Sequence, residues 1–446
     1  MTEHHPGTTP ADRRGASHGG RRGARPLAAV TGGVLALGLA AGVAVWQLDA
    51  PRASDAAAAS EDVQHLGPTE AGVPSVQRVV TDDETALTVA VGPATPGENV
   101  VRLDISGPAA GHGAEHGSEH GSDHGSDEAG VLIGSTGTEP VAAQAVPGTD
   151  GLWARVDLET GSDEVVVELD GVRHTLPVDT GEQVDVSPAW RSADAPECLS
   201  ASVAVLAAGE DPDVGACPSD ELSRADATTL GDTVETLAAR GVRRLAVRAD
   251  DSERSTAALD TVREAAEGSG VEVVDPDAPA TGRTALLEVA GWETSAEGLA
   301  AVSRLPLTEQ PVRSDGTWLA PWLLSRGVVD STSGAVLPLD FDIRSADAAR
   351  YADLVRTLLP GQAPTSSGYA AFAEARGTKP QPVQLYAASR ASILMAEPPT
   401  DGSPTHNHAT QISWFPGGTI TPVGTLEAAG TVLDARENTA SNTLSE

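Results

Sequence analysis

The chain has 446 residues and a formal net charge of −35; 40% of its residues are hydrophobic but only 3% are aromatic. A surface this acidic argues against nucleic acid as a partner, since phosphate binding needs clustered lysine and arginine. Chemistry that depends on lysine is almost excluded, because Lys379 is the only lysine. The histidines fit no known catalytic triad signature, and we expect a protein that is not an enzyme.

The chain begins with a basic segment followed by an apolar one. Five arginines lie in residues 1–25, against two acidic residues, and residues 26–48 carry no charge. At 1.5 Å per residue this apolar stretch is long enough to cross a bilayer core of about 30 Å as a helix. Because arginine favours the cytoplasmic side, the sequence predicts a cytoplasmic tail (1–25), a single transmembrane anchor (26–48) in the cell membrane and an extracytoplasmic remainder. The alternative is a cleaved signal peptide, with the alanine-rich residues 53–59 as the cleavage region.

Two regions of different composition follow the apolar segment. Residues 49–83 are polar and rich in alanine, serine and aspartate, and they predict a stalk. From 84 to 180 short segments alternate between apolar and polar residues, which predicts an all-β antiparallel sandwich. The Asp170-Gly171 pair is typical of a two-residue hairpin within it. The expected strands are 85–91, 99–106, 131–136, 141–146, 152–158, 164–170 and 172–178.

A histidine-rich run interrupts the predicted sandwich at residues 107–130. Its histidines recur every four residues, most of them preceded by an acidic residue, and a glycine follows each, which disfavours a helix. Imidazole and carboxylate ligands suit Cu, Zn or Ni, so the run predicts a transition-metal capture loop. The alternative is a low-complexity polar loop without a ligand. The candidate ligands are His112, His116, His120, His124, Glu115, Glu119 and Asp123.

Residues 84–179 resemble the small extracytoplasmic immunoglobulin-like (Ig-like) domains of the FixH, YtkA and CopC type. The resemblance rests on Pro96, Gly97, Asn99, Val101 and Leu103, followed by a strand that contains Trp153. It implies an Ig-like fold of a kind that often accompanies copper handling. The copper ligands of CopC-type domains have no counterpart here, so the inserted run supplies the only candidate ligands in this region.

Residues 181–220 form a predicted connector that contains the only two cysteines. Cys198 and Cys217 are separated by 18 residues. Outside the cytoplasm a disulfide is the expected state of such a pair. A metal thiolate pair is the alternative, but the spacing lacks a C-x-x-C knuckle.

From 221 to 430 helical periods alternate with apolar strands, which predicts a parallel α/β sheet, and residues 431–446 predict a disordered tail. The expected helices are 228–241, 252–270, 294–304, 346–361, 367–377 and 381–397. The expected strands are 242–249, 271–275, 284–292 and 335–342.

This part of the chain resembles the type I periplasmic binding proteins, the leucine-binding receptor family. The resemblance rests on residues 241–275, 286–292, 334–342 and 364–372, and on a helix that contains Tyr351. It implies a reduced version of that fold, a small solute as ligand, and a transporter or another envelope protein as partner.

Five residues are candidates for a ligand cleft. Asp250 and Ser252 follow the strand expected at 242–249, and open α/β sheets bind ligands at such strand ends. Trp292, Trp318 and Tyr369 could line the cleft. The alternatives are helix capping for the first two and burial for the aromatic residues.

Taken together, these features predict a multidomain, membrane-anchored extracytoplasmic binding protein without catalytic activity. Its parts are a transmembrane helix, an Ig-like sandwich and an α/β domain. The alternative function is a structural or interaction module whose α/β domain has no ligand cleft and docks a partner protein.

Overall fold

The computed structural model describes residues 63–81, 84–107, 130–390, 414 and 418–426, which all lie in one compact unit. In that part of the chain, no helix is long and apolar enough to cross a membrane. The predicted anchor (26–48), the histidines and carboxylates of the predicted metal loop, and the predicted tail (431–446) lie outside the described residues.

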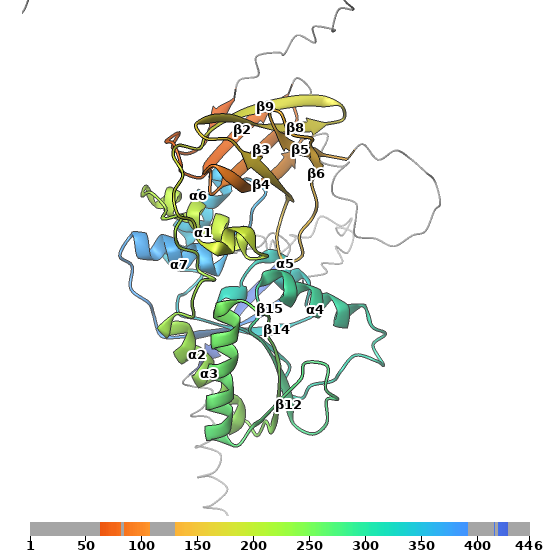
Figure 1. Ribbon diagram of the computed structural model, residues 1–446. Helices are drawn as coiled ribbons and strands as arrows, with labels where there is room; N and C mark the ends of the chain where they lie inside the picture. Colours follow the sequence, from red (N-terminus) through yellow and green to blue (C-terminus); the bar gives the residue numbers. More distant parts are fainter. Residues whose placement is uncertain (1–62, 82–83, 108–129, 391–413, 415–417, 427–446) are drawn as a thin grey trace, which may run out of the picture. The chain divides into compact units, whose positions relative to one another are not determined.

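The first part of the described chain folds into a β-sandwich of two antiparallel sheets (Figure 1). The five-stranded sheet has the order β1 (Gln64–His65), β2 (Ser75–Val80), β3 (Ala86–Gly92), β4 (Gly97–Ser106), β7 (Leu152–Leu158). The four-stranded sheet has the order β6 (Val141–Ala142), β5 (Leu132–Ser135), β8 (Ser162–Leu169), β9 (Val172–Asp179). Valine and leucine side chains from both sheets form one shared core. The predicted hairpin is confirmed: Asp170 and Gly171 both have positive φ, as the turn between β8 and β9 requires.

The sandwich begins before residue 84, and the predicted stalk is wrong for the segment that holds β1 and β2. Strand β2 pairs with β3 along its whole length, from Ser75 opposite Val91 to Val80 opposite Ala86. Val76 and Val79 are buried on opposite faces of the sheet, in two different hydrophobic clusters. Pairing with β3 and burial on both faces outweigh the polar composition around this short strand.

The second part is built on a seven-stranded sheet with the order β11, β10, β12, β13, β14, β15, β16. Its strands are β10 (Arg244–Arg248), β11 (Glu272–Val274), β12 (Thr284–Glu288), β13 (Thr317–Leu319), β14 (Ala335–Leu339), β15 (Gln384–Arg390) and β16 (Gly418–Thr425). The first five strands in that order run parallel to one another, β15 runs antiparallel to β14, and β16 runs antiparallel to β15 and so in the same direction as the first five. The parallel strands therefore follow the doubly wound order 2-1-3-4-5, and the expectation of a parallel α/β sheet is confirmed.

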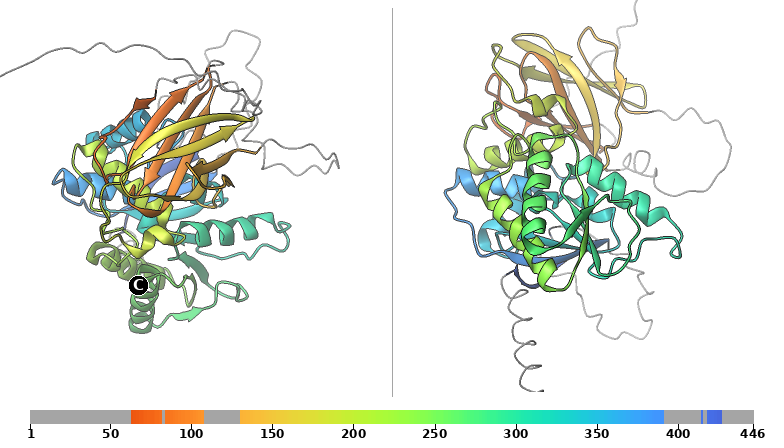
Figure 2. Two further views of the ribbon diagram at one scale, coloured as in Figure 1. Left: turned by 45° about the horizontal axis from the view of Figure 1, so that its top comes forward. Right: turned by 60° about the horizontal axis from the view of Figure 1, so that its bottom comes forward.

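Helices cover the sheet on both faces (Figures 1 and 2). The crossovers through α3 (Glu253–Ser269) and α4 (Trp292–Arg304) run in opposite directions along the sheet, so right-handed connections place them on opposite faces. Helix α2 (Arg224–Ala239) packs against α3, and the short α5 (Arg326–Asp330) packs against α4. Serine residues begin three of these helices: Ser223 caps α2, Ser252 caps α3 and Ser325 caps α5.

The helix predicted at 381–397 is wrong for its described part, because Gln384–Arg390 is strand β15. This strand lies between β14 and β16 and pairs with both along its length. An alanine-rich segment of seven residues is ambiguous between helix and strand, and hydrogen bonds from both sides decide for the strand.

The predicted connector contains a core helix, α1 (Ala195–Ala208), preceded by the short helix η2 (Pro188–Arg191). Helix α1 is buried almost all round. One side joins a cluster with Trp190 and the outer face of the five-stranded sheet, and another contacts α6 (Ala346–Leu358) and α7 (Ser366–Ala375). A helix that packs on two sides needs no polar face, which explains why this segment shows no helical alternation. The predicted disulfide is confirmed and joins Cys198 in α1 to Cys217.

Candidate functional site

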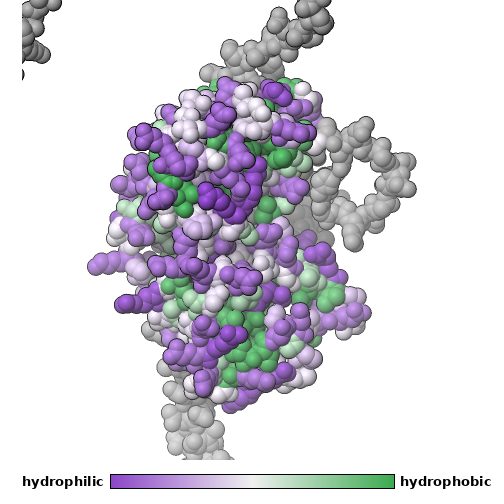
Figure 3. Space-filling view, viewed as in Figure 1, coloured by the Kyte–Doolittle hydropathy of each residue, from purple (hydrophilic) through white to green (hydrophobic). Residues whose placement is uncertain are grey.

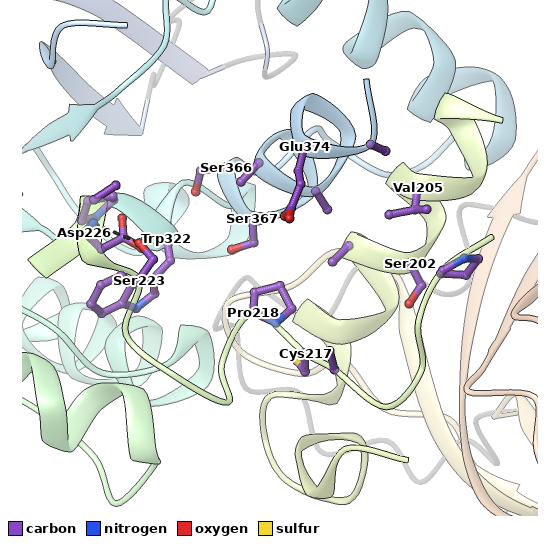
Figure 4. Close-up of a pocket in the computed structure, with 18 of the residues that line it drawn as sticks. Ser202, Val205, Cys217, Pro218, Ser223, Asp226, Trp322, Ser366, Ser367 and Glu374 are labelled. Atoms are coloured by element: carbon purple, nitrogen blue, oxygen red, sulfur yellow. Dashed lines mark hydrogen bonds between the residues drawn. The ribbon is translucent and has the colours of Figure 1, made fainter. Parts of the chain in front are cut away.

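A cavity of about 820 Å³ opens at the carboxyl ends of strands β13 and β14 (Figure 4). Its walls come from α1, the disulfide-linked segment 210–226, the short helix η3 (Pro321–Leu323), the residues after β14, and α7. Open α/β sheets place their ligands in this position, outside the carboxyl ends of the strands. The residues that line the cavity include Ser202, Cys217, Ser223, Asp226, Arg254, Trp322, Asp340, Phe341, Ser366, Ser367 and Glu374.

A buried ion pair forms one wall of the cavity. Arg254, near the start of α3, donates two hydrogen bonds of 2.7 Å to the carboxylate of Glu197 in α1. The two side chains are only 3% and 1% exposed. Burial alone would lower the pKa of Arg254, but the charge of Glu197 and its hydrogen bonds raise this pKa above its usual value. The guanidinium also lies 4.6 Å from the ring centroid of Trp322, and Ser367 donates a hydrogen bond to Glu197. This network joins α1, α3, η3 and α7 at one point.

Carboxylates dominate the polar surface of the cavity. The lining contains Glu210, Asp211, Asp213, Glu221, Asp226, Asp340 and Glu374. Arg254 is the only basic residue among the described residues that line it, and Glu197 already neutralises its charge. Burial raises the pKa of Asp226 and of Asp340. The seven lining carboxylates outnumber the one guanidinium, so the cavity carries a net negative field that Arg254 offsets only in part.

Ser366, at the wall of this cavity, has a buried hydroxyl without a partner among the described residues. It is the first residue of α7, it is one of the residues that line the cavity, and it is 5% exposed. Within the described residues its Oγ makes no hydrogen bond, although its backbone N–H donates to the carbonyl of Leu324 at 3.0 Å. A buried hydroxyl without a partner costs free energy, which a ligand with a polar group at this point would recover.

The switch point of the sheet, between β10 and β12, is closed by the chain itself. Asp250 after β10 accepts a 2.6 Å hydrogen bond from the backbone of Gly291, at the start of α4. A Cβ on Gly291 would lie 2.7 Å from a carboxylate oxygen of Asp194, the residue before α1. Burial and the nearby Glu197 charge raise the pKa of Asp194 to about 6. The start of α1 thus occupies the crevice, and the open space lies farther along the sheet, at β13 and β14.

The structure places Asp250 and Ser252 outside the cavity. Asp250 accepts hydrogen bonds from the backbone N–H and from the hydroxyl of Ser252, at 3.0 and 2.6 Å. Ser252 is the N-cap of α3, and its Oγ accepts from the backbone N–H of Ser255. Their contacts are therefore those of helix capping, the alternative reading of the sequence.

The three aromatic candidates are buried and also lie outside the cavity. The indole of Trp292 donates to the carbonyl of Trp322 at 2.8 Å, and that of Trp318 to the carbonyl of Asp315 at 2.9 Å. Tyr369 packs on Phe341 with ring centroids 4.1 Å apart. In the segment 318–324 it is Trp322 that reaches the cavity, because it follows the end of β13 whereas Trp318 lies within the strand.

Asp340 and Phe341 could have been found from the sequence, since they directly follow a buried strand, as Asp250 does. The serines of α7 and the residues of α1 carry no comparable signal. For metals, the described part of the chain contains no group of three or more histidine, cysteine or acidic residues placed to hold an ion. The predicted metal ligands of the histidine run lie outside it.

No family model and no curated protein matches the chain. Three solved structures are similar to part of it, all solute-binding proteins or ligand-binding receptors. A solute-binding protein of an ABC transporter from Rhodopseudomonas palustris, in complex with 3,4-dihydroxybenzoic acid, is 13% identical over 36% of this chain and 51% of its own, with a TM-score of 0.28. An extracellular ligand-binding receptor from Verminephrobacter eiseniae is 17% identical over 35% of this chain and 50% of its own, with a TM-score of 0.27. The chain thus spans about half the length of these structures. At this level of similarity, function has to be judged from the cavity itself.

Proposed function

We propose that this chain is a binding protein without catalytic activity, and that its α/β part holds a small solute in the cavity described above. The observation that carries the proposal is the cavity itself. Its volume of about 820 Å³ lies in the range typical of small-molecule sites, roughly 300–1,000 Å³. Trp322 and Phe341 supply apolar surface, while Ser366 and the carboxylates supply polar groups.

The lining supports binding over catalysis and over a purely structural role. Among its described residues there is no histidine, and its cysteine, Cys217, is held in the disulfide. The pairs in which a histidine activates a serine or a cysteine are therefore absent from the described lining. A module that only docks a partner protein needs no cavity at the carboxyl ends of its strands.

The setting of this function is also a proposal and is supported by the sequence. The uncharged segment 26–48 would anchor the chain in the cell membrane, with the disulfide on the oxidising side. The histidine run would capture Cu, Zn or Ni close to the membrane, and a transporter or another envelope protein would receive the solute. Deletion of residues 111–128 should abolish uptake of Cu(II), Zn(II) and Ni(II) by the purified chain; equal uptake by both proteins would refute metal capture.

Solute binding can be tested by filling the cavity. Ala370, an exposed alanine of α7, lines the cavity, whereas Ala301, an exposed alanine of α4, does not. The detergent-solubilised full chain and the variants Ala370→Trp and Ala301→Trp would be screened by thermal shift against anionic, neutral and cationic small solutes. We expect at least one solute to stabilise the wild type and Ala301→Trp but not Ala370→Trp. The proposal fails if no solute raises the melting temperature, or if Ala370→Trp responds as the wild type does.

A further inference from the structure

We infer that the cavity selects a small organic cation, an amine whose ammonium group lies among Asp226, Asp340 and Glu374 and whose apolar part rests on Trp322 and Phe341. This inference rests on the proposed function and names the ligand class of the same site. Four features of the cavity support it: the excess of carboxylates in its lining, the capped helix ends beside it, the unpartnered hydroxyl of Ser366, and the origin of its carboxylates from separate elements.

The charge of the lining favours a cation. Seven lining carboxylates face one guanidinium, and that guanidinium forms a bidentate ion pair with Glu197. An anionic solute would find no free positive group among the described lining residues. An ammonium group would be attracted by several carboxylates at once, in a partly buried site where such attraction is stronger than in water.

The helix ends at the cavity do not reverse this preference. The starts of α2 and α7 could in principle attract an anion. At α2, however, the hydroxyl of Ser223 accepts from the backbone N–H of Asp226 at 3.0 Å, and the Asp226 carboxylate lies in the first turn. At α7, the hydroxyl of Thr365 accepts from the backbone N–H of Gly368 at 3.0 Å, and the N–H of Ser366 donates to Leu324. Capping groups and an acidic side chain thus occupy the positions that an anion would need.

The hydroxyl of Ser366 is an independent sign of a ligand. It is buried at the cavity wall and lacks a partner among the described residues, on the same wall as Ser367, whose hydroxyl is engaged with Glu197 (Figure 4). A serine hydroxyl can accept a hydrogen bond, and an ammonium N–H can donate one. Trp322 already packs against one cation, the guanidinium of Arg254, so the aromatic surface of the site is compatible with positive charge.

The spread of the carboxylates favours an organic cation over a metal ion. Asp226 comes from α2, Asp340 from the end of β14 and Glu374 from the last turn of α7. The described residues contain no group of acidic side chains gathered closely enough to hold an ion. A metal needs several oxygens at about 2.0–2.6 Å from one point, whereas an extended amine can interact with carboxylates that lie apart.

Three probes of one shape test the charge preference: 3-phenylpropylamine, 3-phenyl-1-propanol and 3-phenylpropionate. Binding to the detergent-solubilised full chain would be measured by calorimetry. We expect the amine to bind at least about tenfold more tightly than the alcohol and the propionate not to bind, because the three share a phenyl group on a short chain and carry head groups of different charge. Asp340→Asn and Glu374→Gln should each weaken amine binding by about fivefold or more, and Ser366→Ala by a smaller factor. Glu235→Gln, an exposed carboxylate of α2 outside the lining, is the matched control and should leave binding unchanged.

The outcomes separate this inference from the proposed function. If the alcohol or the propionate binds as tightly as the amine, and Ala370→Trp abolishes that binding, the cavity is a solute site but the cation preference is wrong. Amine binding that survives both Asp340→Asn and Glu374→Gln, in variants whose circular dichroism shows a native fold, also overturns the preference. If none of the three probes binds and the wider solute screen is negative as well, both proposals fail together.

Discussion

Replacing Arg254 by methionine tests the buried ion pair at the wall of the cavity. The substitution keeps most of the side-chain volume against Trp322 but removes both hydrogen bonds to Glu197. The Glu197 carboxylate, whose side chain is 1% exposed, would keep only the hydroxyl of Ser367 as a hydrogen-bonding side-chain partner among the described residues. Removing one partner of a buried pair leaves an uncompensated charge, which typically destabilises by about 3–5 kcal/mol. We expect Arg254→Met to lower the free energy of unfolding by that amount at pH 7.

A second variant separates the loss of the pair from the loss of packing. In Glu197→Leu/Arg254→Met both charges are gone, so the desolvation cost of the orphaned carboxylate disappears. We expect the double variant to be more stable than Arg254→Met alone by about 2 kcal/mol or more, which a double-mutant cycle would register as coupling. Arg263→Met is the control, because Arg263 pairs with Asp260 on the exposed face of α3 and should change stability by less than about 0.5 kcal/mol.

The assay is guanidinium denaturation followed by tryptophan fluorescence. The reasoning is refuted if Arg254→Met costs no more than the exposed control, or if the effects at positions 197 and 254 simply add. Either result would mean that water reaches the pair in solution and screens it as it does a surface ion pair.

Three further predictions concern other parts of the fold. Burial, which Arg248 only partly offsets, raises the pKa of Glu288 from 4.5 to about 7, so the folded chain binds more protons than the unfolded chain and loses stability as pH rises between these values. The difference in free energy of unfolding between Glu288→Gln and the wild type should therefore shift by about 3 kcal/mol in favour of the variant from pH 4.5 to pH 8. A difference that is the same at both pH values would contradict the raised pKa of Glu288. Removing the disulfide, which links residues 19 apart, should lower stability by roughly 3 kcal/mol on the chain-entropy model; equal denaturation midpoints for the wild type and Cys198→Ala/Cys217→Ala would argue against it. Asn99 is 1% exposed and makes four hydrogen bonds to the backbone of residues 94–97, where the chain turns into β4. Asn99→Ala should therefore lower the free energy of unfolding by about 2–4 kcal/mol. A variant with the same melting temperature as the wild type would show that water replaces these bonds.

Hydrophilic residues predominate on the face drawn in Figure 3, and hydrophobic ones form patches between them. Such a surface does not by itself locate a binding site, because carboxylates are spread over the whole sequence. The cavity stands out because its lining combines carboxylates with aromatic side chains and with a residue whose buried hydroxyl has no partner among the described residues.

Local features of the structure could be predicted from the sequence. Ser252 caps α3, α6 begins at Ala346 as expected, and Asp170-Gly171 forms the turn of the β8–β9 hairpin. The two cysteines form the expected disulfide. Each of these depends on a few adjacent residues, or on a single possible pair, so the sequence contains the necessary information without the rest of the fold.

Tertiary structure alone decided the remaining features. Strand β15 is a strand because β14 and β16 pair with it on both sides, and α1 is buried all round because a sheet and two helices enclose it. The predicted cleft residues Asp250 and Trp292 lie away from the cavity because the start of α1 closes the crevice at the switch point.

The sequence by itself therefore determined local features such as the cap of α3 and the β8–β9 turn, the excess of acidic residues and the disulfide. The tertiary structure decided where a ligand could bind. The cavity takes its lining from positions as far apart as Ala201 and Ala375, and side chains such as Ser366 and Ser367 have no distinctive sequence context. The physical reason is that burial, loss of a hydrogen-bond partner and convergence of charge are properties of packed neighbours, which the local sequence around each residue does not specify.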